Sequence, residues 1–321
     1  MPDTTLLLKK LLYLYVQRDR TIQPTSPETP NIYITETLNM TVSEIKKYLI
    51  SQLTPVVGAT EAEAMTRVMI LQDLGLSPVD TVLNGQRQIE NFTERRLKEQ
   101  CARVVAGEPL QYVLGQASFH GLELKVNPAV LIPRPETSQL VDIITDRAEG
   151  ASDLNVVDLC TGSGCIILAL GRSLNFPHLT AVDNSPAALQ VAEENARMLH
   201  IDVKFVETDV LSLEPPTTPY YDIIVSNPPY VAESEKKDMD PRVLDHEPAS
   251  ALFVPDNDPL KFYKAISRYA LKALKHNGTL YFEINPLFAT ELQDMLENDG
   301  WGNVQILRDF RGKNRFAVCQ H

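Results

Sequence analysis

An asparagine, two prolines and a tyrosine end a short apolar run, and they are the residues of this chain best suited to chemistry. The apolar run spans residues 222–225, and the four residues are Asn227, Pro228, Pro229 and Tyr230. Such a run is typical of a buried strand, and ligands bind at the carboxyl edge of an open α/β sheet. Proline fixes its own φ and donates no hydrogen bond, so the backbone after Asn227 is stiff and its carbonyl groups are free to accept.

This corner could hold a planar –NH2 group of an amide or an exocyclic amine. The side-chain oxygen of Asn227 and the carbonyl of Pro228 could each accept one of its two hydrogens. The nitrogen lone pair would then point in a third direction, and the ring of Tyr230 could stack on the flat group. Catalysis would come mostly from positioning, with pyramidalisation of the nitrogen favoured by holding both hydrogens. The structural alternative is a strand that simply ends in a Pro-Pro turn.

A glycine-rich loop lies upstream, with the sequence Cys160-Thr161-Gly162-Ser163-Gly164. It follows a predicted strand and begins a predicted helix, so its backbone can approach a ligand closely and the helix offers free N–H groups. Asp183 ends the next predicted strand and could accept both ribose hydroxyls of a nucleotide-like ligand. Ile167 stands where a dinucleotide-binding loop has its third glycine. We therefore expect a ligand with an adenosine but no phosphate, and S-adenosylmethionine is the obvious candidate.

Strands and helices alternate through residues 137–321, which predicts an α/β fold with a doubly wound, mostly parallel seven-stranded sheet. A closing antiparallel hairpin forms the end of this sheet. The expected strands are residues 154–159, 179–183, 203–206, 222–225 and 278–284, with 304–310 and 315–319 as the hairpin.

Residues 40–115 predict a small helical bundle with a scaffold or docking role. Apolar residues recur there at helical spacing, and no glycine loop or acid–histidine cluster appears. Thr60 with Glu63 predicts a capping box, and Thr93 predicts the cap of the last helix. Shielding one side of the next domain is the alternative role.

Residues 116–136 are expected to connect this bundle to the sheet. The alternation predicts a strand over 119–126, a turn at Asn127-Pro128 and a second strand over 130–132. The stiff stretch 133–137 then forms a rigid connector, a wall over the cofactor, or both. Residues 1–39 differ in composition from the rest, and we expect an extension or linker there: either the natural protein begins at Met40, or these residues are a dispensable arm.

The overall composition excludes several classes of protein. The net charge of −12 disfavours wrapping of nucleic acid, and no apolar run reaches the length of a membrane span. The six histidines show no metal-ligand spacing, so we expect no metal, and the four cysteines are too irregular for a disulfide framework. We expect a cytoplasmic monomer.

These motifs together resemble the HemK/PrmC family, the peptide-chain release factor glutamine N5-methyltransferases, which are class I methyltransferases with an Asn-Pro-Pro-Tyr signature. The resemblance extends over about residues 41–319. The stretches that carry it are residues 109–115, 119–122, 131–137, 161–165, 226–230, 247–248 and 262–263.

The resemblance implies a role for each matching residue. Residues 227–230 and Phe119 would hold the glutamine of the Gly-Gly-Gln motif of a class-1 release factor, with Asn227, Pro228 and Tyr230 acting in catalysis. The helical domain would dock that factor. Cys160 stands where a glycine is more usual. The implied cofactor-binding residues are Cys160, Thr161, Gly162, Ser163, Gly164, Asp183, Asp209, Val210 and Asn227.

Two other functions fit part of the sequence. An adenine-N6 methyltransferase would also bind a planar –NH2 group, but it predicts a basic, aromatic target-recognition region that this acidic chain lacks. A cofactor-binding docking protein without activity would not need both Asn227 and Tyr230 beside a complete glycine loop.

Overall fold

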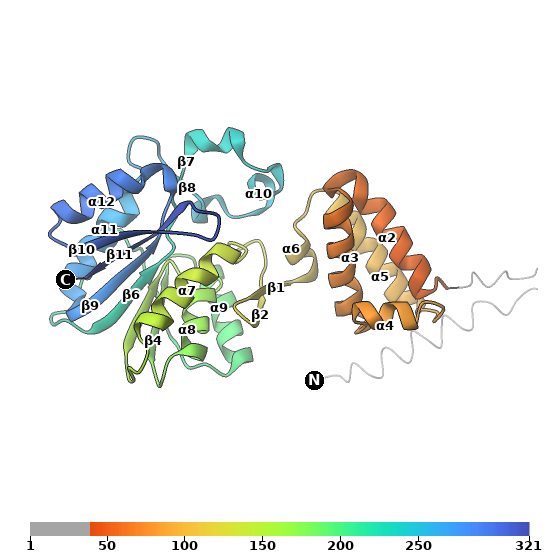
Figure 1. Ribbon diagram of the computed structural model, residues 1–321, viewed down its shortest axis with the longest axis horizontal. Coiled ribbons are helices and arrows are strands. Elements are labelled where there is room, and N and C mark those ends of the chain that lie inside the picture. The colour runs from red at the N-terminus through yellow and green to blue at the C-terminus, as the bar shows by residue number, and fades with distance from the viewer. Residues whose placement is uncertain (1–38, 321) are drawn as a thin grey trace, which may run out of the picture.

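The computed structural model describes residues 39–320 of the chain. The predicted extension falls almost wholly on residues 1–38, which lie outside the described residues, as does His321. A helical unit and an α/β unit are joined by a small hairpin (Figure 1). No helix among residues 39–320 is both long enough and apolar enough to span a bilayer.

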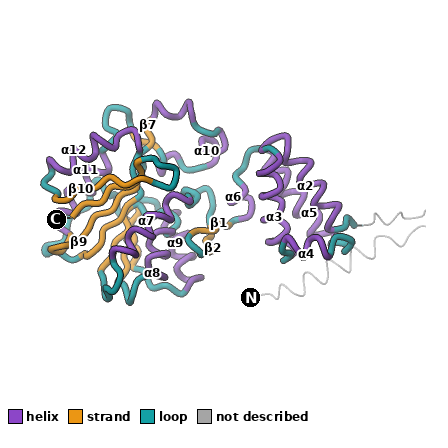
Figure 2. Tube along the Cα trace, in the orientation of Figure 1, coloured by secondary structure: helices purple, strands orange, loops and turns teal. Residues whose placement is uncertain are grey.

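Seven strands form the main sheet in the order β10-β11-β9-β6-β3-β4-β5, so the prediction of its class is confirmed. Figure 2 shows the strands in orange, with helices in purple beside them. The five strands from β9 to β5 are parallel, and β11 pairs antiparallel with both β9 and β10. The chain runs outward from β3 through β4 to β5 and then returns to the other side of β3. The strands are β3 (Asn155–Leu159), β4 (His178–Asp183), β5 (Lys204–Glu207), β6 (Tyr221–Ser226), β9 (Leu274–Glu283), β10 (Gly302–Arg308) and β11 (Asn314–Gln320).

Helices cover both faces of this sheet because its strands are apolar on both sides. Val156 and Val157 are neighbours on β3, yet they belong to two separate core clusters. One cluster contains residues of α7 (Pro135–Arg147), α8 (Cys165–Ser173) and α9 (Pro186–Leu199), and the other contains residues of α11 (Lys261–Ala273) and α12 (Ala289–Asn298). Successive side chains of a strand point to opposite faces, so this division is what a doubly wound sheet requires.

The helical unit has its own apolar core, contributed by four of its five helices. Thr41 with Glu44 and Ser77 with Asp80 form its capping boxes. The helices are α2 (Val42–Val57), α3 (Ala59–Leu74), α4 (Pro78–Leu83), α5 (Asn91–Val105) and α6 (Leu110–Leu114).

The two predicted caps, Thr60 and Thr93, are wrong because each residue lies inside its helix. Helix α3 begins at Ala59 after Gly58, whose φ of 84° is not helical and separates α2 from α3. Thr60 is therefore already inside the first turn. Helix α5 begins at Asn91, which places Thr93 inside its first turn as well. A capping side chain must precede the helix, so neither threonine can act as one.

The connecting hairpin turns earlier than predicted. Strands β1 (Gln116–Phe119) and β2 (Leu122–Lys125) pair antiparallel, with Phe119 opposite Leu122. The turn is His120-Gly121, with φ values of 48° and 75°. Positive φ at both central residues is the conformation that matches the twist of a two-residue hairpin. The predicted single strand over 119–126 and the second strand over 130–132 are therefore wrong. A turn does form at Asn127-Pro128, where the N–H of Val130 donates to the carbonyl of Asn127 at 3.1 Å, but it does not join paired strands.

Candidate active site

A cavity of about 910 Å³, part of it open to solvent, lies at the carboxyl ends of β3, β4 and β6. This is the point where the chain changes direction across the sheet, which is the usual ligand position in this class of fold. The link after β2 and the segment around residue 250 add the remaining walls. The lining residues that belong to the predicted site are Cys160, Thr161, Gly162, Ser163, Asp183, Asp209, Val210, Asn227 and Pro229.

The two glycines of the loop serve different purposes. Gly162 has a φ of 55°, and a Cβ added there would meet no atom within 4 Å, so this backbone faces open space. Gly164 has a φ of 78°, and its added Cβ would lie 3.2 Å from atoms of Ala192 and Leu168. Gly162 therefore leaves room for a ligand, whereas Gly164 allows α8 and α9 to pack closely. Cys160 also has a positive φ, 64°, which a side chain rarely adopts and which explains why glycine suits this position better.

Asp183 ends β4 and holds the glycine loop. Its Oδ2 accepts the N–H of Gly162 at 2.9 Å, and its Oδ1 accepts the N–H of Ser185 at 3.0 Å. Burial raises the pKa of Asp183, while these backbone N–H groups act in the opposite direction. A carboxylate has about four acceptor positions, so both oxygens can still accept from a ligand in the cavity.

Asp158 lies beneath the loop and is fully buried at the end of β3. The hydroxyl of Thr161 donates to its Oδ2 at 2.6 Å. Burial raises the pKa of this carboxyl to about 7, and the nearby Asp183 acts in the same direction. Asp158 does not line the cavity, so we expect the protonation of its carboxyl to affect the stability of the fold and the shape of the glycine loop.

Tyr230 is fixed by residues that the sequence analysis did not single out. Its hydroxyl donates to Oε1 of Glu283 at 3.0 Å, and its carbonyl accepts from Nδ2 of Asn285 at 3.0 Å. Oε2 of the same buried glutamate accepts from the hydroxyl of Thr137 at 2.7 Å. Burial raises the pKa of Glu283 and also that of Tyr230, so the phenol stays a proton donor. An acid at the carboxyl end of a predicted strand was the available signal for Glu283.

Asn195 is a second missed residue, and it ties the hairpin to the glycine loop. It is completely buried on α9. Its Oδ1 accepts the N–H of Lys125 at 2.7 Å, and its Nδ2 donates to the carbonyls of Lys125 and Ser163, both at 3.0 Å. One side chain thus joins three segments that are distant in sequence, which no local pattern predicts.

Four of the predicted residues do not line the cavity: Gly164, Pro228, Tyr230 and Phe119. Pro228 is buried next to Asn227, and Tyr230 uses its hydroxyl to hold the turn. Phe119 is only 3% exposed and belongs to the core cluster that contains Leu124. Its contact with a substrate stays a prediction, as do the stacking role of Tyr230 and the acceptor role of the Pro228 carbonyl.

Two family models match the chain. Residues 46–115 match the PrmC N-terminal domain, and residues 136–248 match the methyltransferase small domain. The first match coincides with the helical unit, and the second includes most of the cavity lining.

Curated relatives match nearly their whole length. The release factor glutamine methyltransferase of Bacteroides thetaiotaomicron is 38% identical over 278 residues, 87% of this chain and 99% of the relative. Its namesake in Bacillus subtilis is 34% identical over 87% of this chain and 97% of the relative. Among solved structures, the T. thermophilus 16S rRNA N2 G1207 methyltransferase, in complex with AdoMet and guanosine, has a TM-score of 0.47 at 20% identity over 64% of this chain and 49% of that one.

Proposed function

Because the chain belongs to the release factor glutamine methyltransferase family, we propose that it methylates the glutamine of the Gly-Gly-Gln motif in class-1 peptide-chain release factors, with S-adenosylmethionine as the methyl donor. The acceptor is the side-chain amide nitrogen, N5. The observation that carries the proposal is that Asn227 and Asp183 line the same cavity. An amide-binding group and a ribose-binding acid therefore face one space.

The residues of the cavity suit S-adenosylmethionine. Asp183 has acceptor positions left for the two ribose hydroxyls, and the open face of Gly162 lets the ligand approach the backbone. Val210 offers an apolar surface for the adenine, with Asp209 next to it in the lining. When bound, this cofactor supplies a methyl group on a positively charged sulfur.

The protein's own contribution to the reaction is positioning. Asn227 accepts one hydrogen of the substrate amide through its side-chain oxygen, and the carbonyl of Pro228 accepts the other. The lone pair of an amide nitrogen is delocalised into the carbonyl group. Holding both hydrogens out of the amide plane reduces this delocalisation and makes the nitrogen a better nucleophile. The bond from Tyr230 to Glu283 keeps the turn rigid, so both acceptors stay in place.

The helical unit is proposed to dock the release factor, while the α/β unit performs the chemistry. The match of residues 46–115 to the PrmC N-terminal domain supports this division. The net charge of −12 supports a protein substrate rather than a nucleic acid. We also propose that the protein acts as a cytoplasmic monomer.

A methylation assay with labelled S-adenosylmethionine tests this function. We expect label to enter purified class-1 release factor, and neither a variant with alanine in place of the Gly-Gly-Gln glutamine nor duplex DNA. Label in the DNA alone would instead favour an adenine methyltransferase. Equal labelling of both forms of the release factor would place the modification on another residue.

Asp183 gives a test of the cofactor site. Replacing it with alanine should raise the Kd for S-adenosylmethionine by about tenfold to a hundredfold, since hydrogen bonds to a charged group are lost. Asp183→Asn is the matched variant, because it keeps an acceptor for the N–H of Gly162 but loses the charge. Calorimetry measures both affinities. If both variants bind like the wild type, Asp183 does not hold the ribose.

A further inference from the structure

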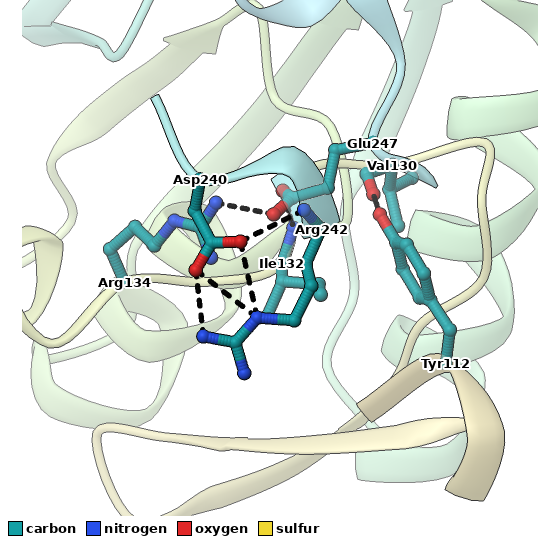
Figure 3. A network of polar contacts seen from close by, with 7 residues as sticks. All are labelled: Tyr112, Val130, Ile132, Arg134, Asp240, Arg242 and Glu247. Carbon is teal, nitrogen blue, oxygen red and sulfur yellow. Dashed lines mark hydrogen bonds and ion pairs between the residues drawn. The ribbon is translucent and has the colours of Figure 1, made fainter. Parts of the chain in front are cut away.

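A single carboxylate joins the two segments that close the cavity. Glu247 is buried, with 1% of its side chain exposed. Its Oε2 accepts a hydrogen bond from the backbone N–H of Ile132 at 3.2 Å, and its Oε1 accepts one from Nη2 of Arg134 at 2.5 Å (Figure 3). The partners are 115 and 113 residues away in sequence.

Both of the joined segments line the cavity. Val130, Leu131, Pro133 and Arg134 come from the link after the hairpin, and Pro248, Ser250 and Ala251 come from the segment that Glu247 begins. The link does not belong to any strand of the described chain, so no strand pairing fixes it against the second segment. The distance between these two walls therefore depends on the contacts of Glu247.

Other polar contacts lie close to those of Glu247. The hydroxyl of Tyr112, on α6, donates to the carbonyl of Val130 at 2.6 Å (Figure 3). Arg242, on α10 (Pro241–His246), contacts Asp240 at 2.7 Å and reaches Glu61 of the helical unit at 3.4 Å. The pair with Glu61 is partly exposed and contributes little by itself. The bonds of Glu247 to Ile132 and Arg134 are therefore the buried contacts that join the two walls.

We propose that Glu247 is a positioning residue for S-adenosylmethionine: its carboxylate holds the link against the segment 248–251 and so sets the shape of the cavity. The proposal rests on the proposed function for the identity of the ligand. A carboxylate can satisfy a backbone N–H and a guanidinium together, whereas a neutral amide loses the charge that holds Arg134. The link would then move relative to the opposite wall.

The test compares Glu247→Gln with a matched control. Asp222→Asn removes a carboxylate with similar contacts, since Asp222 accepts the N–H of Asn155 at 2.8 Å and Nζ of Lys275 at 2.7 Å. Asp222 is the second residue of β6, at the opposite end of that strand from Asn227, and does not line the cavity. We expect Glu247→Gln to raise the Kd for S-adenosylmethionine, measured by calorimetry, by about tenfold, the typical effect of losing a charged hydrogen bond. Asp222→Asn should bind the cofactor like the wild type.

Steady-state kinetics separate positioning from a general loss of structure. Glu247→Gln should raise the KM for S-adenosylmethionine and leave the KM for the release factor unchanged, whereas partial unfolding would lower the active fraction without this split. Glu247→Asp, which keeps the charge, should recover part of the affinity. An unchanged cofactor Kd in a folded Glu247→Gln protein would overturn the proposal.

Should Glu247→Gln fail to fold, Arg134→Gln decides the matter, because it breaks the same ion pair and leaves Glu247 bonded to Ile132. The cofactor Kd should then rise in the same way, and an unchanged value would overturn the proposal. The proposed function fails separately: in that case the wild-type protein itself would not bind S-adenosylmethionine or would not methylate release factor.

Discussion

Asn227→Ala is expected to reduce kcat for release factor methylation by roughly 10²- to 10³-fold, the range seen when one preorganised polar group is removed from a reacting centre. The alanine cannot accept a hydrogen of the substrate amide, so the nitrogen lone pair stays conjugated and the amide group is no longer held in one orientation. The cofactor should still bind with nearly the wild-type Kd, because Asp183 and the glycine loop are untouched. Single-turnover assays at saturating cofactor measure the chemical step, and calorimetry measures the affinity.

Asn155→Ala is the control for this substitution. Asn155 begins β3, at the opposite edge of the sheet, and its Nδ2 donates to Asp222 at 3.3 Å. The substitution Asn155→Ala removes an asparagine side chain from the same sheet, far from the cavity, and should leave kcat at the wild-type value. Activity of Asn227→Ala equal to that of the control would refute the proposal that this amide holds the substrate.

Asp158→Asn is expected to make the protein more stable than the wild type at neutral pH. Burial raises the pKa of Asp158 to about 7 from its ordinary value of 3.8. Between these two pH values the folded protein keeps a proton that the unfolded chain has released, so the wild-type free energy of unfolding falls as the pH rises. The loss reaches about 4 kcal/mol, since a tenfold change in proton affinity corresponds to about 1.4 kcal/mol. The asparagine cannot ionise and avoids this loss.

Urea unfolding at a series of pH values from 2 to 8 checks this expectation. The difference in unfolding free energy, variant minus wild type, should grow between about pH 4 and 7 and then level off. Asp222→Asn provides a control of opposite sign. Although burial acts to raise it, the pKa of Asp222 is lowered by Lys275 and Asn155, so its contribution is lost as the pH falls. A difference for Asp158→Asn that does not vary with pH would contradict the raised pKa.

The strands of the sheet could be predicted because each is a local apolar run with a clear end. All seven appear within a few residues of their predicted positions. Helix starts and the hairpin turn depend on which of several suitable residues comes first, and there the sequence pattern was ambiguous. Helix α3 begins at Ala59, directly after Gly58, so Thr60 cannot cap it, and the positive φ of His120 allows a turn inside an alternating run.

The residues of the candidate site are also of two kinds: those that local motifs predict, and those that only the folded chain brings together. The glycine loop, Asp183 and Asn227 lie in short motifs at the ends of strands, so topology alone brings them to one edge. Asn195 and Glu283 act on residues 70 and 53 positions away, and only the folded chain puts them in contact. Long-range supporting contacts of this kind leave no periodic signal in a single sequence.

The strand order also determines when the reactive corner can be completed during synthesis. Strand β6 lies between β3 and β9, but β9 begins only at Leu274 and Glu283 is its last residue. While the ribosome makes the intervening chain, one edge of β6 has no partner and Tyr230 has no acceptor for its hydroxyl. A nascent chain that stops before residue 283 therefore carries the whole glycine loop and the Asn-Pro-Pro-Tyr stretch without a rigid turn. Cofactor present during translation can stabilise the finished corner only after β9, with Glu283 at its end, has emerged.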